Sequence, residues 1–284
     1  MKKTFRNSII MLLVVILLTG CGTNQEAIKP ADENNNNVTA SPEENAGQDE
    51  TAGQEDGVTK LDGHSLLIFC GAGMKDPFEK IAQQFQESTG CEVQVTYANA
   101  AQIQTQINTA KEGDFFIAGS KEEVKPVEDL VQSSKDLVQH IPVLAVASGN
   151  PKGITGPADL SSDGIKFIMG DPESTPIGKI ANKVISDFQL KDKINIVANT
   201  ATAPAMIMAL EAGEADVALV WQENVKSDKL EIVDSEDMAP YIKIIPAAML
   251  SCTTDEEAQK IFNEYLDTQE VKDIWVEFGY KIVE

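Results

Sequence analysis

The segment that decides the fold reads SLLIFCGAGMKDPFEKIAQQF and runs from Ser65 to Phe85. Its opening run, as far as Phe69, is short and apolar, which is typical of a buried strand. Apolar residues then recur with helical spacing, at Phe78, Ile81, Ala82 and Phe85. Asp76 is placed to cap this helix, Pro77 to occupy its first position and Gly90 to end it. The segment therefore predicts a strand followed by a helix, the repeating unit of an α/β sheet.

Strands and helices keep alternating on both sides of a break at 149–153 that is rich in Gly and Pro. Before the break, we expect strands at 92–97, 114–118 and 141–147 and a helix at 102–110. After it, we expect strands at 165–169, 194–198, 215–221 and 241–249, with helices at 177–188, 205–212, 255–269 and 271–278. These two sets predict an α/β fold with two lobes, each a mainly parallel sheet flanked by helices.

The predicted lobes form a clamshell. Lobe I comprises 63–146 and 241–284, lobe II comprises 147–240, and the hinge lies near Ala147 and Pro240. In open α/β sheets, ligands bind beyond the carboxyl ends of the strands. The turns between strands and helices in both lobes should therefore line a cleft.

The N-terminal residues have the pattern of a bacterial lipoprotein signal. A basic leader precedes an apolar run from Ile9 to Leu18, which is followed by Thr19-Gly20-Cys21. The run is about half as long as a bilayer core requires, so it predicts a signal peptide at 1–20 and lipidation of Cys21. The alternative is an ordinary cleaved signal that happens to end in a cysteine. Residues 21–62, which are acidic and poor in apolar side chains, predict a disordered tether.

Lipidation would hold the protein on the outer face of the cell membrane, because two or more acyl chains make a durable anchor. The formal net charge of −22 excludes nucleic acid as a partner. We expect Cys70, Cys91 and Cys252 to be free or buried thiols, and their spacing does not suggest zinc.

No catalytic motif appears in the sequence. The only histidines are His64 and His140, which we expect to be structural. A nucleophile elbow, a phosphate-binding loop and a metal motif are all missing. We therefore expect a binding protein that is not an enzyme and needs no cofactor and no metal.

Small, uncharged residues fill the turns expected to line the cleft. In lobe I these turns hold Ala72, Gly73 and Met74, then Asn99 and Ala100, then Gly119. In lobe II they hold Thr175 and Ile177, then Thr202 and Ala203. Helix N-termini offer free N–H groups and about half a positive charge, which suits an oxyanion. The alternative interpretation is structural, because every parallel sheet needs capped helices and small residues in such turns.

Trp221 ends the last strand predicted for lobe II, which places it at the edge of the cleft. A tryptophan is more often a core or interface residue than a ligand contact. Its position favours the cleft.

Four segments resemble the periplasmic molybdate- and tungstate-binding proteins, the substrate-binding subunits of molybdate ABC transporters. They read FCGAGM at 69–74, GDFFIAG at 113–119, GDPESTPIG at 170–178 and GEADVALVW at 213–221. The resemblance extends over nearly all of residues 64–284. It implies a type II periplasmic-binding-protein fold, a monomer that holds molybdate or tungstate with backbone N–H groups and hydroxyls and passes it to an ABC permease.

The same resemblance assigns individual residues. The amides of Ile177 and Ala203 match ligand donors, and Trp221 stands where the family often has a ligand tyrosine. Gly73 and Ala100 stand where the family usually has ligand serines, so two hydroxyl donors are missing and affinity should fall about a hundredfold. A metal ion or complex, or a small organic anion, is the alternative cargo, and a ligand-sensing receptor lobe is the alternative role.

Overall fold

The computed structural model describes residues 59–283. The expected signal peptide at 1–20, the lipidation site Cys21 and most of the expected tether lie outside these residues. Within 59–283, no helix is both long enough and apolar enough to cross a bilayer.

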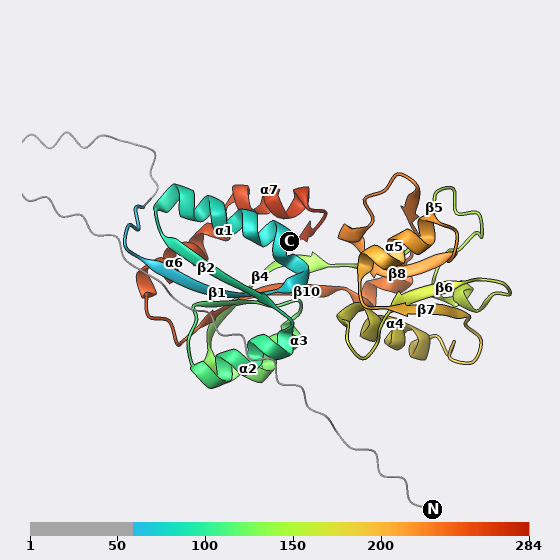
Figure 1. Cartoon of the computed structure of the whole chain (residues 1–284), viewed down its shortest axis with the longest axis horizontal. Helices are drawn as coiled ribbons and strands as arrows, with labels where there is room; N and C mark the ends of the chain where they lie inside the picture. Colours follow the sequence, from blue (N-terminus) through green and yellow to red (C-terminus); the bar gives the residue numbers. More distant parts are fainter. Residues whose placement is uncertain (1–58, 284) are drawn as a thin grey trace, which may run out of the picture. The chain divides into compact units, whose positions relative to one another are not determined.

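A six-stranded sheet, with the order β11-β4-β10-β3-β1-β2, forms the centre of what we call the first half (Figure 1). Its strands are β1 (Ser65–Gly71), β2 (Glu92–Ala98), β3 (Phe115–Ile117), β4 (Val131–His140), β10 (Lys243–Leu250) and β11 (Lys281–Ile282). β1 runs parallel to β2 and β3, whereas β10 runs antiparallel to β3 and β4.

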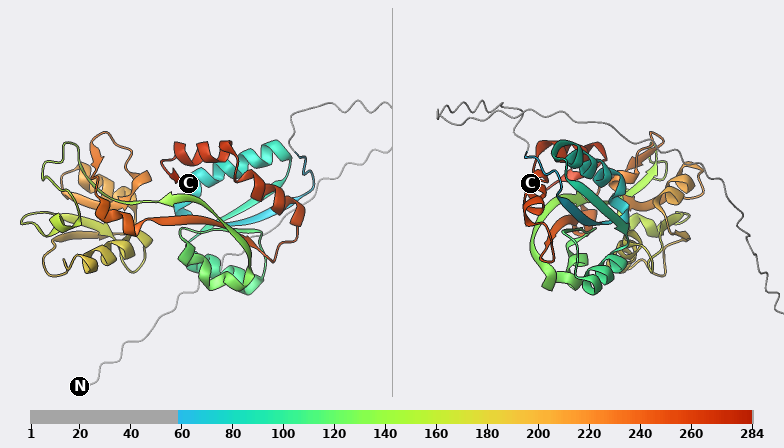
Figure 2. Two further views of the ribbon diagram at one scale, coloured as in Figure 1. Left: turned by 180° about the vertical axis from the view of Figure 1, so that it is seen from behind. Right: turned by 60° about the vertical axis from the view of Figure 1, so that its left-hand side comes forward.

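Helices cover both faces of this sheet (Figures 1 and 2). One face carries α1 (Lys75–Thr89), α6 (Glu256–Tyr265) and α7 (Gln269–Glu277), and the other carries α2 (Ala100–Ala110) and the short α3 (Lys121–Val124). Phe85 of α1 and Phe262 of α6 meet edge-on, with ring centroids 4.9 Å apart. On the opposite face, Ile103 and Ile107 of α2 are fully buried in a separate cluster. The apolar stripe that predicted α1 is thus buried in the core of the first half.

A five-stranded sheet, with the order β7-β6-β8-β5-β9, forms the centre of the second half. Its strands are β5 (Pro142–Ala147), β6 (Phe167–Gly170), β7 (Ile196–Thr200), β8 (Val217–Trp221) and β9 (Leu230–Ile232). The helices α4 (Pro176–Asp187) and α5 (Ala203–Glu211) cover its opposite faces (Figure 1). Short 3-10 helices complete the described chain: η1 (Ala72–Met74), η2 (Lys125–Leu130), η3 (Pro157–Ser161), η4 (Gln222–Asn224) and η5 (Glu236–Tyr241).

The chain crosses between the halves at Ile141 and Ile242, which corrects the hinge expected near Ala147 and Pro240. β5 pairs with β8 and β9, so 142–146 belong to the second sheet rather than to lobe I. Nearly every residue of β5 is buried, which requires a neighbouring strand on each side and cover on both faces. Tyr241 is buried in the core of the second half, immediately before the second crossing.

β4 is the strand that the apolar pattern did not predict. Its central residues, 132–136, are polar and mostly exposed, so they show no apolar alternation. Antiparallel pairing with β10 holds this strand in the sheet. Because β10 and β5 both run antiparallel to their neighbours, the two sheets are mixed rather than mainly parallel.

Two expectations about where elements begin are also corrected. α1 starts at Lys75 with Met74 as its N-cap, so Asp76 lies in the first turn instead of capping the helix. Leu61, expected in the tether, is fully buried, and its N–H donates to the Thr89 carbonyl at 2.7 Å. The packed structure therefore includes Leu61, because this leucine joins the core under α1.

Candidate functional site

The turn after β1 leaves the start of α1 without a side-chain cap among the described residues. Ala72, Gly73 and Met74 form the single turn η1, and Met74 is the N-cap of α1. The Met74 side chain is buried in the core of the first half. Gly73 is exposed, and a Cβ added to it would meet no atom of the described chain within 4 Å. Lys75 donates its N–H to the Ala72 carbonyl, so α1 continues directly from η1, and open space lies beside this start at Gly73.

The start of α5 is arranged in the same way. Thr202 is its N-cap, yet within 59–283 the Thr202 hydroxyl caps no N–H group. The Thr202 carbonyl accepts a hydrogen bond from Oγ1 of Thr200 at 3.0 Å. Ala203 is the first residue of the helix, and its N–H belongs to the end that carries partial positive charge.

Both helix starts contribute to one pocket of about 290 Å³. The first half supplies Gly73, Asp76 and Pro77 at α1, with Phe278 and Tyr280 after α7. The second half supplies Ala203, Pro204 and Ile207 of α5, with Glu223, Asn224 and Lys226 after β8. The walls combine apolar side chains with a few charged and hydrogen-bonding groups, which is the usual composition of a small-molecule site.

Next to the pocket, His140 and Glu223 connect the two halves. Nε2 of His140 lies 2.9 Å from Oε1 of Glu223, and each side chain is only 10% exposed. The imidazole also stacks on the Trp221 indole, with ring centroids 3.4 Å apart. Nε2 of Gln222 donates to the Gly279 carbonyl at 3.2 Å, which adds a second link between the halves. Trp221 is therefore held against His140 rather than along the pocket wall.

Tyr280 and Lys226 supply donors at the pocket. Burial, and then the charge of Glu223, raise the pKa of Tyr280, so its hydroxyl keeps its proton at neutral pH. Nζ of Lys226 lies 5.6 Å from the centroid of the Phe278 ring, which places an ammonium group from the second half over an aromatic ring from the first.

Other residues expected in the cleft have partners within the protein. Asn99 forms a capping box with Gln102 at the start of α2, where Ala100 is the first helical residue. Oγ1 of Thr175 accepts from the Gly178 N–H at 3.0 Å and donates to the Asp171 carbonyl at 2.7 Å. These two polar side chains therefore serve as helix caps.

The amide of Gly119 is also occupied. Its N–H donates to Oε2 of Glu123 at 2.8 Å. Burial raises the pKa of Glu123, although the Gly119 bond acts in the opposite direction. An anion that used this amide would have to displace a carboxylate.

The pocket brings together Gly73 and Ala203 and leaves the other expected ligand residues outside its lining. Those outside are Ala72, Met74, Asn99, Ala100, Gly119, Thr175, Ile177, Thr202 and Trp221. The remaining lining residues were not among the expected ligand residues: Asp76, Pro77, Pro204, Ile207, Glu223, Asn224, Lys226, Phe278 and Tyr280. Phe278 and Tyr280 flank a glycine after the last helix, a segment that the sequence pattern assigned only to packing.

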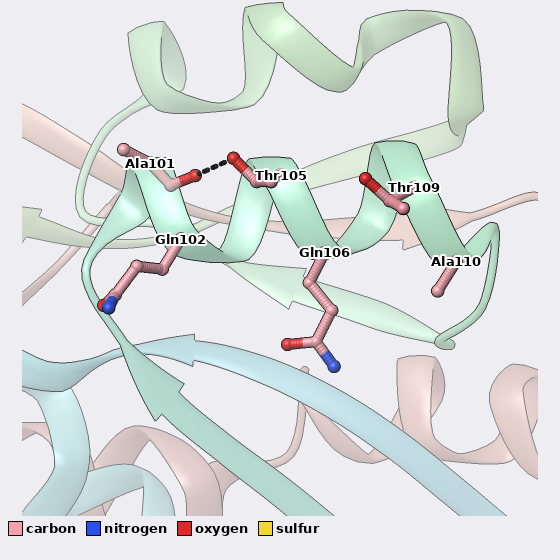
Figure 3. Close-up of a pocket in the computed structure, with 6 residues that line it drawn as sticks. All are labelled: Ala101, Gln102, Thr105, Gln106, Thr109 and Ala110. Atoms are coloured by element: carbon pink, nitrogen blue, oxygen red, sulfur yellow. Dashed lines mark hydrogen bonds between the residues drawn. The ribbon is translucent and has the colours of Figure 1, made fainter.

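A larger hollow of about 560 Å³ lies along α2, on the outer face of the first half. Figure 3 shows its lining as one uncharged face of a single helix, where the Thr105 hydroxyl donates to the Ala101 carbonyl at 2.8 Å. This lining contains no charged group among the described residues and draws on one half only. The pocket shared by the two halves is the better candidate.

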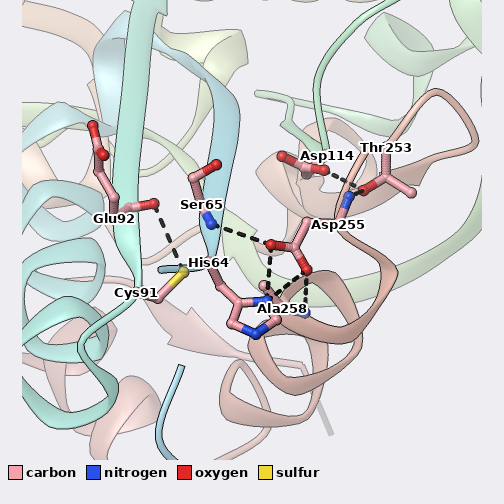
Figure 4. Close-up of polar contacts among 8 residues, drawn as sticks. All are labelled: His64, Ser65, Cys91, Glu92, Asp114, Thr253, Asp255 and Ala258. Atoms are coloured by element: carbon pink, nitrogen blue, oxygen red, sulfur yellow. Dashed lines mark hydrogen bonds and ion pairs between the residues drawn. The ribbon is translucent and has the colours of Figure 1, made fainter. Parts of the chain in front are cut away.

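A polar cluster ties the beginning of the first half to α6 (Figure 4). His64 Nδ1 lies 3.0 Å from both carboxylate oxygens of Asp255, which caps α6. Thr253 donates to Asp114, whose other oxygen accepts from the Leu67 N–H at 2.6 Å. The His64 ring is thus a structural group, as the sequence analysis expected.

Metal-ligating side chains do not converge in the part of the chain that the structure describes. Within 59–283, no group of three or more His, Cys, Asp or Glu side chains is placed to hold a metal ion. Cys70, Cys91 and Cys252 are free thiols, and burial raises the pKa of each.

Comparison with known proteins identifies the family. Residues 66–281 match the family described as bacterial extracellular solute-binding protein. A binding protein of Haemophilus influenzae is 32% identical over 213 residues, which cover 73% of this chain and 87% of that protein. The molybdate-binding protein ModA of Mycobacterium tuberculosis is 22% identical over 260 residues, covering 89% of this chain and 88% of that protein.

A solved structure gives the same result. A substrate-binding domain from Clostridium difficile, assigned to a molybdenum ABC transporter, is 27% identical. The match covers 78% of this chain and 99% of that one, with a TM-score of 0.65. The predicted α/β fold, with two sheets flanked by helices, is confirmed. These relatives are substrate-binding transport proteins and not enzymes, so that expectation is confirmed too. With its match over residues 66–281, the chain belongs to the bacterial extracellular solute-binding proteins, and it is similar to the molybdate-type members that serve ABC transporters.

Proposed function

We propose that this chain, as a monomer, captures a small oxyanion between its two halves and delivers it to an ABC permease, with molybdate and tungstate as the first candidates. The observation that carries the proposal is the shared pocket, to which α1 of the first half and α5 of the second each contribute an uncapped start. Uncapped N–H groups and helix dipoles favour an anion without a full countercharge.

In this proposal the two halves act as lobes that rotate about the crossings at Ile141 and Ile242. An anion that contacts both helix starts stabilises the state in which they are close together. Binding shifts the population toward that state only through contacts that the open state lacks. The closed surface is then what the permease recognises.

We further propose that the protein is anchored to the outer face of the cell membrane through acyl chains on Cys21. The apolar run that ends at Leu18, followed by Thr19-Gly20-Cys21, supports this assignment. Residues between Cys21 and Leu61 then link the anchor to the packed part of the chain.

A thermal-shift panel tests the cargo. The chain should begin at Gln54, so that the buried Leu61 is retained. Molybdate, tungstate, sulfate, phosphate and divalent metals are compared, and a ligand at about a hundred times its Kd should add about 2.7 kcal/mol of stability. A shift with molybdate or tungstate supports the proposal. A shift with divalent metals alone would contradict it.

Replacement of Cys21 tests the anchor. Cys21→Ser should move the protein from the membrane fraction to the medium or periplasm and abolish labelling by radioactive palmitate. Cys252→Ser, which changes a thiol in the first half, is the matched control and should leave both readouts unchanged. Continued membrane attachment of Cys21→Ser would refute the lipid anchor.

A further inference from the structure

The shared pocket is larger than an inorganic oxyanion requires, and we infer that it accepts an anionic group carried on a small, hydroxylated organic body. The ligand class is hydroxylated carboxylates and phosphate esters. This inference rests on the proposed capture of an anion and widens its cargo. The pocket has a volume of about 290 Å³. A tetrahedral oxyanion, which is one central atom with its oxygens, leaves much of that volume unfilled.

Open space at Gly73 is the first reason for this assignment. A Cβ at this position would meet no described atom within 4 Å, so there is room beside the start of α1. The anionic group would lie at the starts of α1 and α5, which have no side-chain cap among the described residues and carry partial positive charge. Lys226 lines the same pocket and adds a full positive charge.

The apolar walls are the second reason. Pro77 and Phe278 from the first half face the pocket together with Pro204 and Ile207 from the second. Such walls give no stabilisation to a hydrated inorganic ion, because loss of its water is not compensated there. Carbon atoms of an organic body lose apolar surface to water when they contact these walls, which favours binding.

The acidic side chains of the pocket define the rest of the ligand. Glu223 is already paired with His140 at 2.9 Å and stands beside the Tyr280 hydroxyl. Asp76 is exposed in the first turn of α1. An ionised carboxylate only accepts hydrogen bonds, so a ligand hydroxyl is the neutral group that pairs with Asp76.

Calorimetric titration of the full chain with glycerate, glycerol phosphate and molybdate tests the inference. At least one organic anion should bind, and the two organic probes separate a carboxylate from a phosphate group. Ile207→Gln should lower organic-anion affinity about tenfold by making the wall polar. Met208→Gln is the matched control, because Met208 is the next residue of α5, is 69% exposed and does not line the pocket. Lys226→Gln, at an exposed position, should also lower affinity about tenfold.

The outcomes separate this inference from the proposed function. Binding of molybdate without either organic anion would refute the inference and leave oxyanion capture standing. Organic-anion affinity equal in Ile207→Gln and Met208→Gln would place that ligand elsewhere and also refute it. No binding of any of the three probes would overturn both proposals.

Discussion

Nε2 of His140 lies 2.9 Å from Oε1 of Glu223, and this contact joins β4 of the first half to η4 of the second. Both side chains are 10% exposed, so their contact lies in surroundings with little water, where a hydrogen bond is stronger. His140 is the last residue of β4, immediately before the chain crosses at Ile141. The pair thus couples the halves at the point about which they would rotate.

Glu223→Gln should weaken this coupling. The amide replaces a charge-assisted hydrogen bond with a neutral one, so the free energy of unfolding should fall by about 1–3 kcal/mol in urea denaturation. Glu277→Gln is the control, because Glu277 pairs with Lys80 at 2.7 Å while both side chains are at least 40% exposed. An exposed pair contributes at most about 1 kcal/mol. Equal losses in the two variants would contradict a special role for the His140–Glu223 contact.

Gly73→Ser should increase affinity for inorganic oxyanions. A Cβ fits at Gly73 without meeting any described atom within 4 Å, so the variant should fold normally. The new hydroxyl would lie beside the uncapped start of α1, and one hydrogen bond to a charged ligand should raise molybdate or tungstate affinity about tenfold or more. Calorimetric titration measures the change. An unaltered Kd, with the transition temperature also unaltered, would mean that this turn does not contact the anion.

Gly178→Ala should lower the stability of the fold, whereas Gly73→Ser should leave it unchanged. A Cβ at Gly178 would overlap the backbone of Asp171, which cannot move aside as a flexible side chain can. The start of α4 would have to shift and lose its hydrogen bond to Thr175, so unfolding should become easier by about 1–3 kcal/mol or more. Gly213→Ala lacks such a clash, although its positive φ of 72° adds strain of about 1 kcal/mol. Urea denaturation of the two variants compares steric overlap with backbone strain.

Local patterns in the sequence predicted the elements that bury one apolar stripe. Phe78 and Phe85 mark the stripe of α1, and Gly90 ends the helix in a left-handed conformation, as expected. β4 could not be predicted in this way, since its polar centre is held by β10, which lies far away in the sequence. The crossing at Ile141 follows from the same long-range pairing.

The candidate site was predictable only in part, for a similar reason. Gly73 and Ala203 stand at helix starts that a local pattern reveals. Phe278 and Tyr280 line the same pocket only because α7 packs on the first half and the residues that follow it lie next to η4. Such a placement depends on tertiary packing, and residue types alone carry no signal for it.

The His64–Asp255 pair should make stability depend on pH. The hydrogen bond with Asp255 raises the pKa of His64 above its ordinary value of 6.5. Burial acts to raise the pKa of Asp255, but hydrogen bonds from His64 and from the Ala258 and Ser65 N–H groups lower it below 3.8. The raised histidine pKa stabilises the fold fully below pH 6.5 and loses its effect as pH rises through the folded value. The lowered aspartate pKa stabilises the fold above pH 3.8 and loses its effect as pH falls through the folded value.

The His64–Asp255 pair therefore stabilises the fold most between pH 3.8 and pH 6.5. His64→Gln should lower the transition temperature more at about pH 5.5 than at alkaline pH, because the stabilisation that comes from the raised His64 pKa is lost as pH rises. Comparing variant with wild type at each pH removes the contribution of other titrating groups. The same decrease at both pH values would show that protonation of His64 adds nothing to stability.

Truncation before β1 should reveal the contribution of Leu61. This side chain is fully buried, and its N–H donates to the Thr89 carbonyl at the end of α1 at 2.7 Å. A chain that begins at Gly63 should be about 2–5 kcal/mol less stable than one that begins at Gln54, the range for loss of a buried leucine. Leu61→Ala in the longer chain should reproduce most of this loss. Lys60→Ala removes only an exposed hydrogen bond to the Ser88 carbonyl and should cost about 0.5 kcal/mol. Equal stability of the two chains would mean that the fold begins at Gly63, because Leu61 would then add nothing to the core beneath α1.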